Sequence, residues 1–272
     1  MISKLAPRII TGALFIVAVV VSVLFSPWLY FVLFGFFTIV GMLEFYKVSD
    51  HLGFKPQKPV GIIIGIAIFT LLFLNAGKLI APKLLYIVPA LITVIPIIEL
   101  FRQKSTPTSD WAQTLFAPIY VALPFGLMSN FMYLPDTHEF SAKIFLSFFV
   151  FVWVSDTGAF VTGSLLGKHK LCERISPKKT IEGLAGGVIF TILTAIPVYH
   201  IAGVFSLAQW IMLSVITVIF ANLGDLAESM LKRNADLKDS GKLLPGHGGI
   251  LDRFDSALLA CQPVWLAIVL TT

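Results

Sequence analysis

One apolar segment of this 272-residue chain ends in a stripe of polar side chains whose types could do chemistry. The four residues are spaced three, one and three positions apart, so they share one face of a helix: Asp225, Glu228, Ser229 and Lys232. Carboxylates gathered without histidine or cysteine favour hard cations. Mg²⁺ typically takes one or two protein carboxylates and binds substrate phosphates as well. The carboxylates of the stripe therefore suit a hard cation such as Mg²⁺.

Other acids reach the same depth from different segments. Asp156 lies about 22 Å along its expected helix and Asp225 about 27 Å along its own, at 1.5 Å per residue. Asp252 and Asp255 stand three positions apart where the last apolar segment begins. An acid at the centre of a membrane-spanning helix costs about 2.5–3.5 kcal/mol on insertion scales. Three segments bring carboxylates to the same depth on one side of the membrane. This agreement indicates a functional site rather than acids placed independently.

Two further acids are interpreted differently. Glu44 and Glu99 fall at the ends of apolar segments. We interpret both as interfacial acids beside water, and the first 140 residues show no polar cluster within an apolar segment.

Two polar segments, 164–182 and 231–254, are rich in lysine, arginine and glycine. Glycines let backbone N–H groups approach a phosphate, and cations neutralise it. Basic segments beside a membrane are by themselves typical of topology signals and anionic-lipid contacts. Combined with the acids, they predict a metal–polyphosphate site. His247 stands between glycines and is interpreted first as a turn histidine, because no partner lies at zinc-ligand spacing.

The composition sets the class of protein. Hydrophobic residues make up 57% of the chain and charged residues 13%, against roughly 45–50% and about 25% in soluble domains. This excludes disorder, a secreted disulfide scaffold and a soluble nucleic-acid binder. Cys172 and Cys261 lie far apart, so neither a disulfide framework nor a thiolate zinc site is indicated. We expect an all-α, polytopic integral membrane protein.

Helices of about 20 apolar residues cross a bilayer, and nine such spans are predicted. An eight- or ten-span count stays open, and the short break at 204–206 is the weakest boundary. The first span is interpreted as a retained helix rather than a cleaved signal peptide, because it lacks a small-x-small site. The predicted spans are residues 8–25, 27–46, 59–76, 82–101, 111–133, 141–163, 183–204, 207–230 and 255–271.

The basic residues predict the orientation. With the N-terminus in the cytoplasm, 17 of the 20 lysines and arginines fall inside, and only Lys78, Lys83 and Lys143 fall outside. The net charge of +5 therefore reports topology rather than nucleic-acid binding. We expect residues 1–140 to form supporting spans and residues 141–272 to form the catalytic region, with the site facing the cytoplasm from a bacterial inner membrane.

The polar segments carry a recognisable pattern. The letters SMLKR at 229–233, KD at 238–239 and PGHGGILDRFD at 245–255 resemble the signature of the phosphatidate cytidylyltransferase (CDP-diacylglycerol synthase) family. Upstream, SDTGAF at 155–160, GKHK at 167–170 and SPKKTIEG at 176–183 resemble the other cytosolic stretch of that family. Ile181 stands where many members carry tryptophan, and Ser164 where a basic residue is common. The resemblance covers residues 155–255.

The resemblance implies an activity and its cofactor. That family transfers CMP from CTP to phosphatidic acid with Mg²⁺, giving CDP-diacylglycerol and pyrophosphate in phospholipid biosynthesis. Its members are polytopic homodimers with a two-cation centre and bind no nucleic acid. By resemblance, Asp225 and Asp252 are metal ligands, supported by Asp255, Glu228 and Asp156. Asp156 has an alternative role, which is to fix a basic side chain.

If the reaction is a nucleotidyl transfer, roles can be predicted for the remaining polar residues. Basic side chains would hold the triphosphate and the leaving pyrophosphate: Lys178, Lys179, Lys232 and Arg233. Lys238 and Arg253 would orient the lipid phosphate or the acids. The predicted substrate-binding set is Lys168, Ser176, Lys178, Thr180, Glu182, Ser229, Lys238, Asp239, His247 and Arg253. The predicted catalytic set is Asp225, Asp252, Lys179, Lys232, Arg233 and Asp156.

Three other functions fit part of the pattern. A proton-coupled carrier would use Asp156 and Asp225 as an ion relay, but it expects charges near the midplane and often inverted repeats. Another membrane transferase, acting for example on a polyprenyl phosphate, fits the carboxylates and basic segments equally well. A scaffolding protein gives no reason for the stripe at 225–232.

Overall fold

The computed structural model describes residues 2–243, 246 and 248–272, with side chains from Thr11 onward. Within these residues the chain divides into two compact units. Unit 1 comprises residues 1–130 and 231–254, and unit 2 comprises residues 131–230 and 255–272. Each unit is described by itself.

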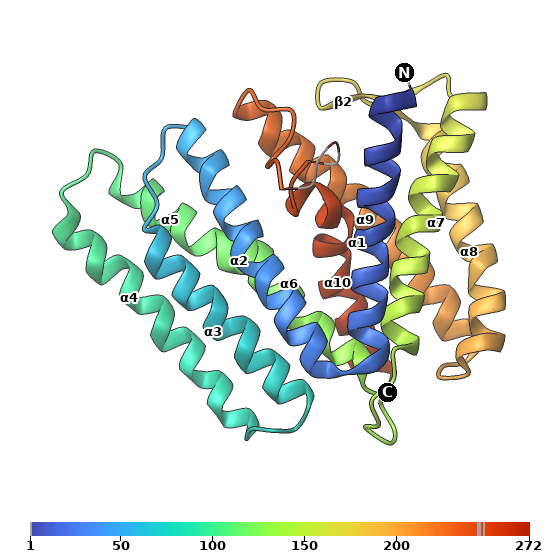
Figure 1. Ribbon diagram of the computed structural model, residues 1–272, viewed down its shortest axis with the longest axis horizontal. Coiled ribbons are helices and arrows are strands. Elements are labelled where there is room, and N and C mark those ends of the chain that lie inside the picture. The colour runs from blue at the N-terminus through green and yellow to red at the C-terminus, as the bar shows by residue number, and fades with distance from the viewer. Residues whose placement is uncertain (1, 244–245, 247) are drawn as a thin grey trace. The chain divides into compact units, whose positions relative to one another are not determined.

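Unit 1 consists of the apolar helices of residues 1–130, together with the end of α9 and the start of α10, which come later in the chain. In Figure 1 the ribbon of α3 lies between those of α2 and α4. Ser26 accepts a hydrogen bond from the backbone N–H of Trp28 and begins α2, with Pro27 at its first position. Its helices are α1 (Ile2–Phe25), α2 (Pro27–His51), α3 (Lys58–Ala76), η1 (Pro82–Tyr86), α4 (Ile87–Arg102), α5 (Pro107–Ala117), η2 (Pro118–Ala122) and α6 (Leu123–Met128), and η3 (Ser129–Met132) spans its boundary with unit 2.

The core of unit 1 is aromatic. Tyr30 stacks on Phe34 of the same helix with ring centroids 4.2 Å apart, and Phe31 packs on Phe73 of α3 at 4.8 Å. Such pairs add about 0.5–1.5 kcal/mol beyond the burial of their area. The contact between Phe31 and Phe73 fixes α2 against α3, and α2 carries Glu44 toward its other end.

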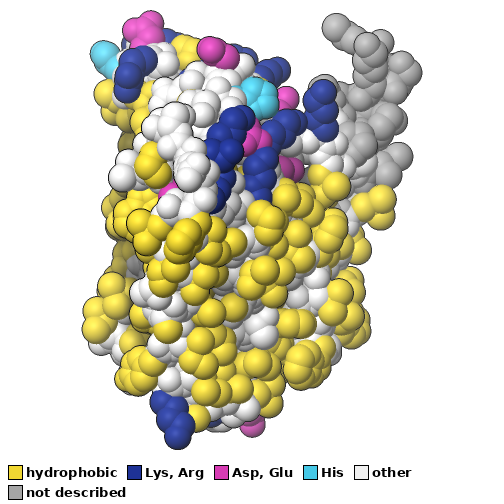
Figure 2. All heavy atoms as spheres, turned by 90° about the vertical axis from the view of Figure 1, so that its left-hand side faces the viewer, with side chains coloured by type: hydrophobic (Ala, Val, Ile, Leu, Met, Phe, Trp, Pro, Cys, Tyr) yellow, Lys and Arg dark blue, Asp and Glu magenta, His cyan; other side chains and the backbone are white. Residues whose placement is uncertain are grey.

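The surface of unit 1 on the side of α4 suits a bilayer. Figure 2 shows hydrophobic side chains over most of this face, with most of the charged side chains toward one end and a few at the other. Leu100 and Phe101 of α4 are 79% and 81% exposed. Exposed apolar side chains on this scale mark a surface covered by lipid or by another protein.

Unit 2 carries the two polar segments predicted to matter for chemistry. Its elements are α7 (Lys143–Leu166), β1 (Lys170–Cys172), β2 (Ser176–Thr180), α8 (Ile181–Ala202), α9 (Leu207–Asn234) and α10 (Leu251–Thr271), the last two extending across the division between units. The strands β1 and β2 form an antiparallel hairpin between α7 and α8, with Lys170 opposite Thr180. The sequence predicted only a polar segment here, because the strands are short and basic.

The helices α7 and α8 pack with their backbones in close approach. A Cβ atom built on Gly187 would lie 2.9 Å from the carbonyl oxygen of Ser155, and one on Gly183 would lie 2.8 Å from that of Ala159. Small residues permit such approach in membrane helices. The tight pairing fixes both ends of the hairpin, and therefore the lysines that it carries.

The predicted spans agree closely with these helices. Within the described residues, eight helices are long and apolar enough to cross a membrane, and they match the second to ninth predicted spans. The first predicted span coincides with α1, whose described apolar part, Thr11–Phe25, is shorter. The break near 204–206 is confirmed, because Gly203 ends α8 with a φ of 62° and α9 begins at Leu207. The all-α polytopic fold is confirmed, while the count of nine and the orientation stay predictions.

The span predicted at 111–133 is not one regular helix. Pro118 and Pro124 each lack a backbone N–H, and the chain passes through a π-helical turn at Pro118–Ala122 before α6. Proline removes a hydrogen bond from a helix interior, and π turns are one way to accommodate the change.

Candidate active site

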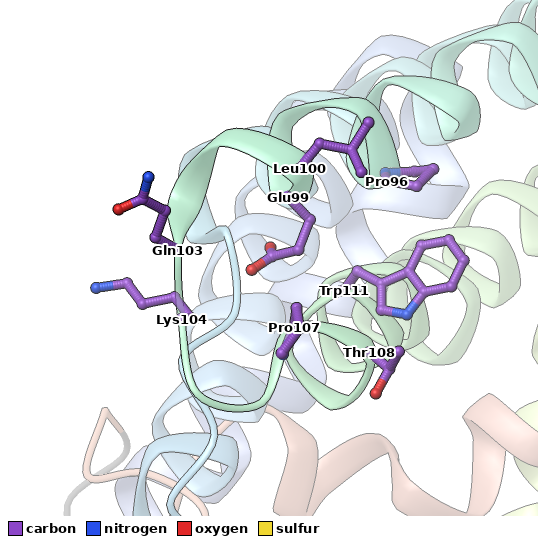
Figure 3. A pocket seen from close by; sticks show the side chains of 8 residues that line it. All are labelled: Pro96, Glu99, Leu100, Gln103, Lys104, Pro107, Thr108 and Trp111. Carbon is purple, nitrogen blue, oxygen red and sulfur yellow. The ribbon is translucent and has the colours of Figure 1, made fainter.

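A cavity of about 450 Å³ in unit 1 lies between the end of α4 and the start of α5 (Figure 3). Its charged lining residues are Glu99 and Lys104. Oε2 of Glu99 accepts hydrogen bonds from Gln57 at 2.5 Å and Arg102 at 2.7 Å, and its side chain is buried. The interpretation of Glu99 as an acid beside water is therefore wrong. The cavity contains none of the predicted site residues, so the candidate site lies elsewhere.

The candidate active site is a cavity of about 420 Å³ within unit 2. It lies among α7, the hairpin, α8 and α9. The polar residues that line it are Asp156, Ser164, Lys178, Lys179, Thr180, Asn222 and Asp225. Four of the residues that the sequence singled out for metal or triphosphate binding therefore share one cavity.

Lys179 and Asp225 are the pair at the centre of this arrangement. The Nζ atom of Lys179, on β2, lies 2.7 Å from Oδ2 of Asp225, on α9. Oδ1 of Asp225 accepts a hydrogen bond from Ser229 at 3.2 Å. The hairpin thus places the ammonium group of Lys179 directly against the acid that is predicted to hold the metal ion.

The donor set of the cavity fits a hard cation bound together with a phosphate compound. Asp156 on α7 and Asp225 on α9 present carboxylates to the same space, beside Lys178 and Lys179. One or two carboxylates are the usual protein contribution to a Mg²⁺ site. In the part of the chain that the structure describes, no three or more histidine, cysteine, aspartate or glutamate residues gather as a metal site. Mg²⁺ usually keeps several waters and also binds substrate phosphates, so two carboxylates would be a sufficient protein contribution.

The hairpin is held in place by residues that the sequence assigned to substrate. Glu182, in the first turn of α8, accepts hydrogen bonds from the backbone N–H groups of Lys168 at 3.0 Å and His169 at 3.2 Å. It also contacts Nδ1 of His169 at 2.5 Å. Thr180 caps α8 by accepting a hydrogen bond from Gly183 at 3.1 Å. In this structure both side chains position the hairpin.

Asp252 belongs to unit 1, where it organises the segment before α10. Its Oδ1 accepts a hydrogen bond from Lys232 at 2.6 Å. Its Oδ2 accepts from the backbone of Ser240 at 2.9 Å, from the hydroxyl of Ser240 at 2.9 Å and from the backbone of Gly249 at 2.7 Å. Asp225 belongs to unit 2, so the hypothesis that the two aspartates share a cation stays a prediction.

The other predicted residues differ in how far they are buried. Glu228 is buried on α9. Asp255 accepts a hydrogen bond from the next backbone N–H, that of Ser256, at 2.7 Å. Arg233 donates to the carbonyl oxygen of Leu237 at 3.1 Å. Lys168, Lys238, Asp239 and Arg253 are exposed and Ser176 is half-buried. His247 lies outside the described residues.

Sequence reasoning missed two polar residues. Glu44 was interpreted as an acid beside water, which is wrong: it is 7% exposed, and its Oε2 accepts a hydrogen bond from the backbone of Leu251 at 3.0 Å. Asn222 lines the cavity and donates to Ser155 at 3.3 Å. Its position three residues before Asp225, on the same helix face, was the available signal.

Comparison with known proteins shows the family of the chain. A model of the cytidylyltransferase family matches residues 6–271. The chain belongs to the cytidylyltransferase family, a class of nucleotidyl-transferring enzymes. The resemblance to phosphatidate cytidylyltransferases is confirmed, and the carrier and scaffolding alternatives lose their support.

Several curated relatives are named phosphatidate cytidylyltransferase. One from Staphylococcus saprophyticus is 47% identical over 150 residues, which is 54% of this chain and 55% of the relative. One from Staphylococcus haemolyticus is 37% identical over 219 residues, 70% of this chain and 81% of the relative. One from Staphylococcus epidermidis is 41% identical over 164 residues, 60% of each chain. The matched part of the chain thus spans about half of the first relative and four fifths of the second.

Proposed function

We propose that this chain transfers the cytidylyl group of CTP to phosphatidate and so makes CDP-diacylglycerol for phospholipid biosynthesis. The observation that carries the proposal is the Lys179–Asp225 pair at 2.7 Å inside a cavity lined by a second acid and a second lysine. The names of the staphylococcal relatives suggest the two substrates.

The reaction asks mainly for positioning and charge neutralisation. A phosphate oxygen of phosphatidate is already anionic and attacks the α-phosphorus of CTP. The new O–P bond forms as the bond between the α-phosphorus and its bridging oxygen breaks, and the electron pair leaves with pyrophosphate. No strong general base is needed, so alignment and electrostatic stabilisation carry the catalysis.

The residues of the cavity suit these tasks. Lys178 and Lys179 would bind the triphosphate, and their charges would stabilise the pyrophosphate as it leaves. Asp225 and Asp156 would hold Mg²⁺, which when bound neutralises negative charge on the phosphates. Asp252, Asp255 and Glu228 remain predicted ligands, and a second cation remains an expectation from the resemblance.

One proposed substrate, CTP, is dissolved in water and the other, phosphatidate, lies in the bilayer, so the site is expected at the membrane surface. Eight candidate spans among the described helices would keep the protein in the bilayer, and the acyl chains of phosphatidate would stay there while its headgroup reaches the cavity. We propose that the protein lies in the inner (plasma) membrane of a bacterium, with the cavity toward the cytoplasm. Its bacterial relatives support the location, and its basic residues favour the orientation. We also propose that the protein forms a homodimer.

A labelling experiment tests the activity. Purified protein in detergent receives phosphatidate, Mg²⁺ and CTP labelled either at the α- or at the γ-phosphorus. Cytidylyl transfer carries only the α-label into the lipid phase. A γ-label in lipid would identify a kinase instead. Undecaprenyl phosphate in place of phosphatidate tests the alternative acceptor.

A further inference from the structure

We infer that Glu44, on α2, is a positioning residue that holds the segment bearing Asp252. Glu44 lies in the N-terminal part of the chain, for which the sequence indicated only supporting spans. Its carboxylate is buried, and Oε2 accepts the backbone N–H of Leu251 at 3.0 Å. Glu44, Leu251 and Asp252 all belong to unit 1.

Two glycines close around the same carboxylate. A Cβ atom built on Gly241 would lie 2.0 Å from Oε1 of Glu44, and one built on Gly249 would lie 2.4 Å from each carboxylate oxygen. The two glycines themselves approach each other, because the Cβ built on Gly241 would lie 3.0 Å from Cα of Gly249. Glu44 therefore fills the space around which residues 241 and 249 are arranged.

The backbone groups next to these contacts are the ones that bind Asp252. The N–H of Gly249 donates to Oδ2 of Asp252 at 2.7 Å, and Ser240, beside Gly241, donates to the same oxygen through its N–H and its hydroxyl. A movement of Gly241 or Gly249 would therefore move the donors that orient Asp252. Glu44 therefore acts on Asp252 through this segment, and the two carboxylates also interact electrostatically.

Aromatic contacts also join the start of α10 to α2. Phe254 packs against Phe34 and Phe37 of α2, with ring centroids 5.7 and 5.4 Å apart, and against Phe125 at 4.9 Å. The apolar contacts fix the helix laterally. The charge of Glu44 lies at the N-terminus of α10, where unsatisfied N–H groups and the helix dipole favour an anion.

The inference rests on the proposed function, because Asp252 is assigned to the reaction only there. Glu44→Ala removes the carboxylate and should lower kcat about 100-fold, as a misplacement near 1 Å can do. Glu44→Gln keeps an oxygen that can accept from Leu251, so its kcat should fall by no more than about tenfold. The KM for CTP should change little in both.

A second readout does not depend on activity. Hydrogen exchange of peptides covering residues 238–254 should speed up in Glu44→Ala, and less in Glu44→Gln. Unchanged exchange in Glu44→Ala would overturn the inference, whatever the activity. A wild-type protein that transfers no cytidylyl group would instead refute the proposed function and leave the exchange result to decide the role of Glu44.

The matched control is Glu99→Ala. Glu99 is an equally buried glutamate of unit 1, and it is bound to Gln57 and Arg102 instead. The kcat of Glu99→Ala should remain within about threefold of wild type, because residues without shared partners act nearly independently. Exchange over residues 238–254 should be unchanged. Equal losses of kcat in Glu44→Ala and Glu99→Ala, measured per folded molecule, would reduce Glu44 to a general structural role and overturn the inference.

A double-mutant cycle tests the steric contact directly. Gly249→Ala should lower kcat strongly while Glu44 is present, because its methyl group and the carboxylate compete for one space. In the Glu44→Ala background that space is free, so the added loss should be under about threefold, a clear departure from additivity. Additive losses would show that residues 44 and 249 act independently and would contradict the inference.

Discussion

The ammonium group of Lys179 and the carboxylate of Asp225 lie 2.7 Å apart, because the short β-hairpin between α7 and α8 brings the lysine of β2 against α9. Both side chains are only partly exposed, at 22% and 31%. In the proposed reaction this lysine binds the triphosphate beside the acid that holds the cation.

Lys179→Ala should therefore lower kcat/KM for CTP by about 10²–10³, the range for loss of one preorganised donor to developing charge. Steady-state kinetics at saturating phosphatidate measure the effect. The matched control is Lys170→Ala, since Lys170 is an exposed lysine of the same hairpin. A Lys179→Ala protein as active as Lys170→Ala would contradict the assignment.

Glu182 anchors the start of the hairpin, so its loss should act indirectly. Glu182→Ala removes the acceptor for the N–H groups of Lys168 and His169, and kcat should fall by about tenfold through misplacement of Lys179. Trypsin should cleave after Lys168 or Lys170 faster than in wild type.

His169→Ala separates the two contacts that Glu182 makes. The His169 side chain is 75% exposed, and exposed ion pairs contribute only about 0–1 kcal/mol. The backbone N–H groups remain in this variant. We expect activity and cleavage close to wild type, and an effect as large as that of Glu182→Ala would show that the imidazole rather than the backbone anchors the hairpin.

The close pairing of α7 and α8 predicts a stability effect. Gly187→Leu would force a side chain against the backbone of Ser155, and overpacking of this kind typically costs about 1–3 kcal/mol. Its Tm in detergent should fall measurably. Ala185→Leu is the control, because Ala185 is exposed on the same helix, and it should leave the Tm nearly unchanged.

Most of the fold could be predicted from the sequence because membrane spans are long and apolar. The second to ninth predicted spans agree with helices of the structure. The hairpin could not be predicted, because its strands pair over few residues and carry lysines rather than alternating apolar side chains. The π turn at Pro118–Ala122 also depends on how neighbouring helices accommodate two prolines.

The candidate site could be predicted only in part. Asp156, Lys178, Lys179 and Asp225 were identified by residue type, by depth in the membrane and by resemblance, and they share one cavity. Glu44 was misinterpreted because its partner, the N–H of Leu251, lies more than 200 positions away in the chain. Nothing local distinguishes a glutamate that caps a distant helix from one that faces water.

In the proposed reaction, Asp225 is essential to a Mg²⁺-dependent cytidylyl transfer. We would measure transfer of α-labelled CTP into phosphatidate by wild type, Asp225→Asn and Asp236→Asn, with and without EDTA. Asp236 is an exposed acid near the end of the same helix, in a left-handed conformation that asparagine also adopts. We expect label in lipid for wild type and for Asp236→Asn, lost with EDTA and restored by excess Mg²⁺. We expect no label in lipid for folded Asp225→Asn. Full transfer by Asp225→Asn would contradict this role of Asp225.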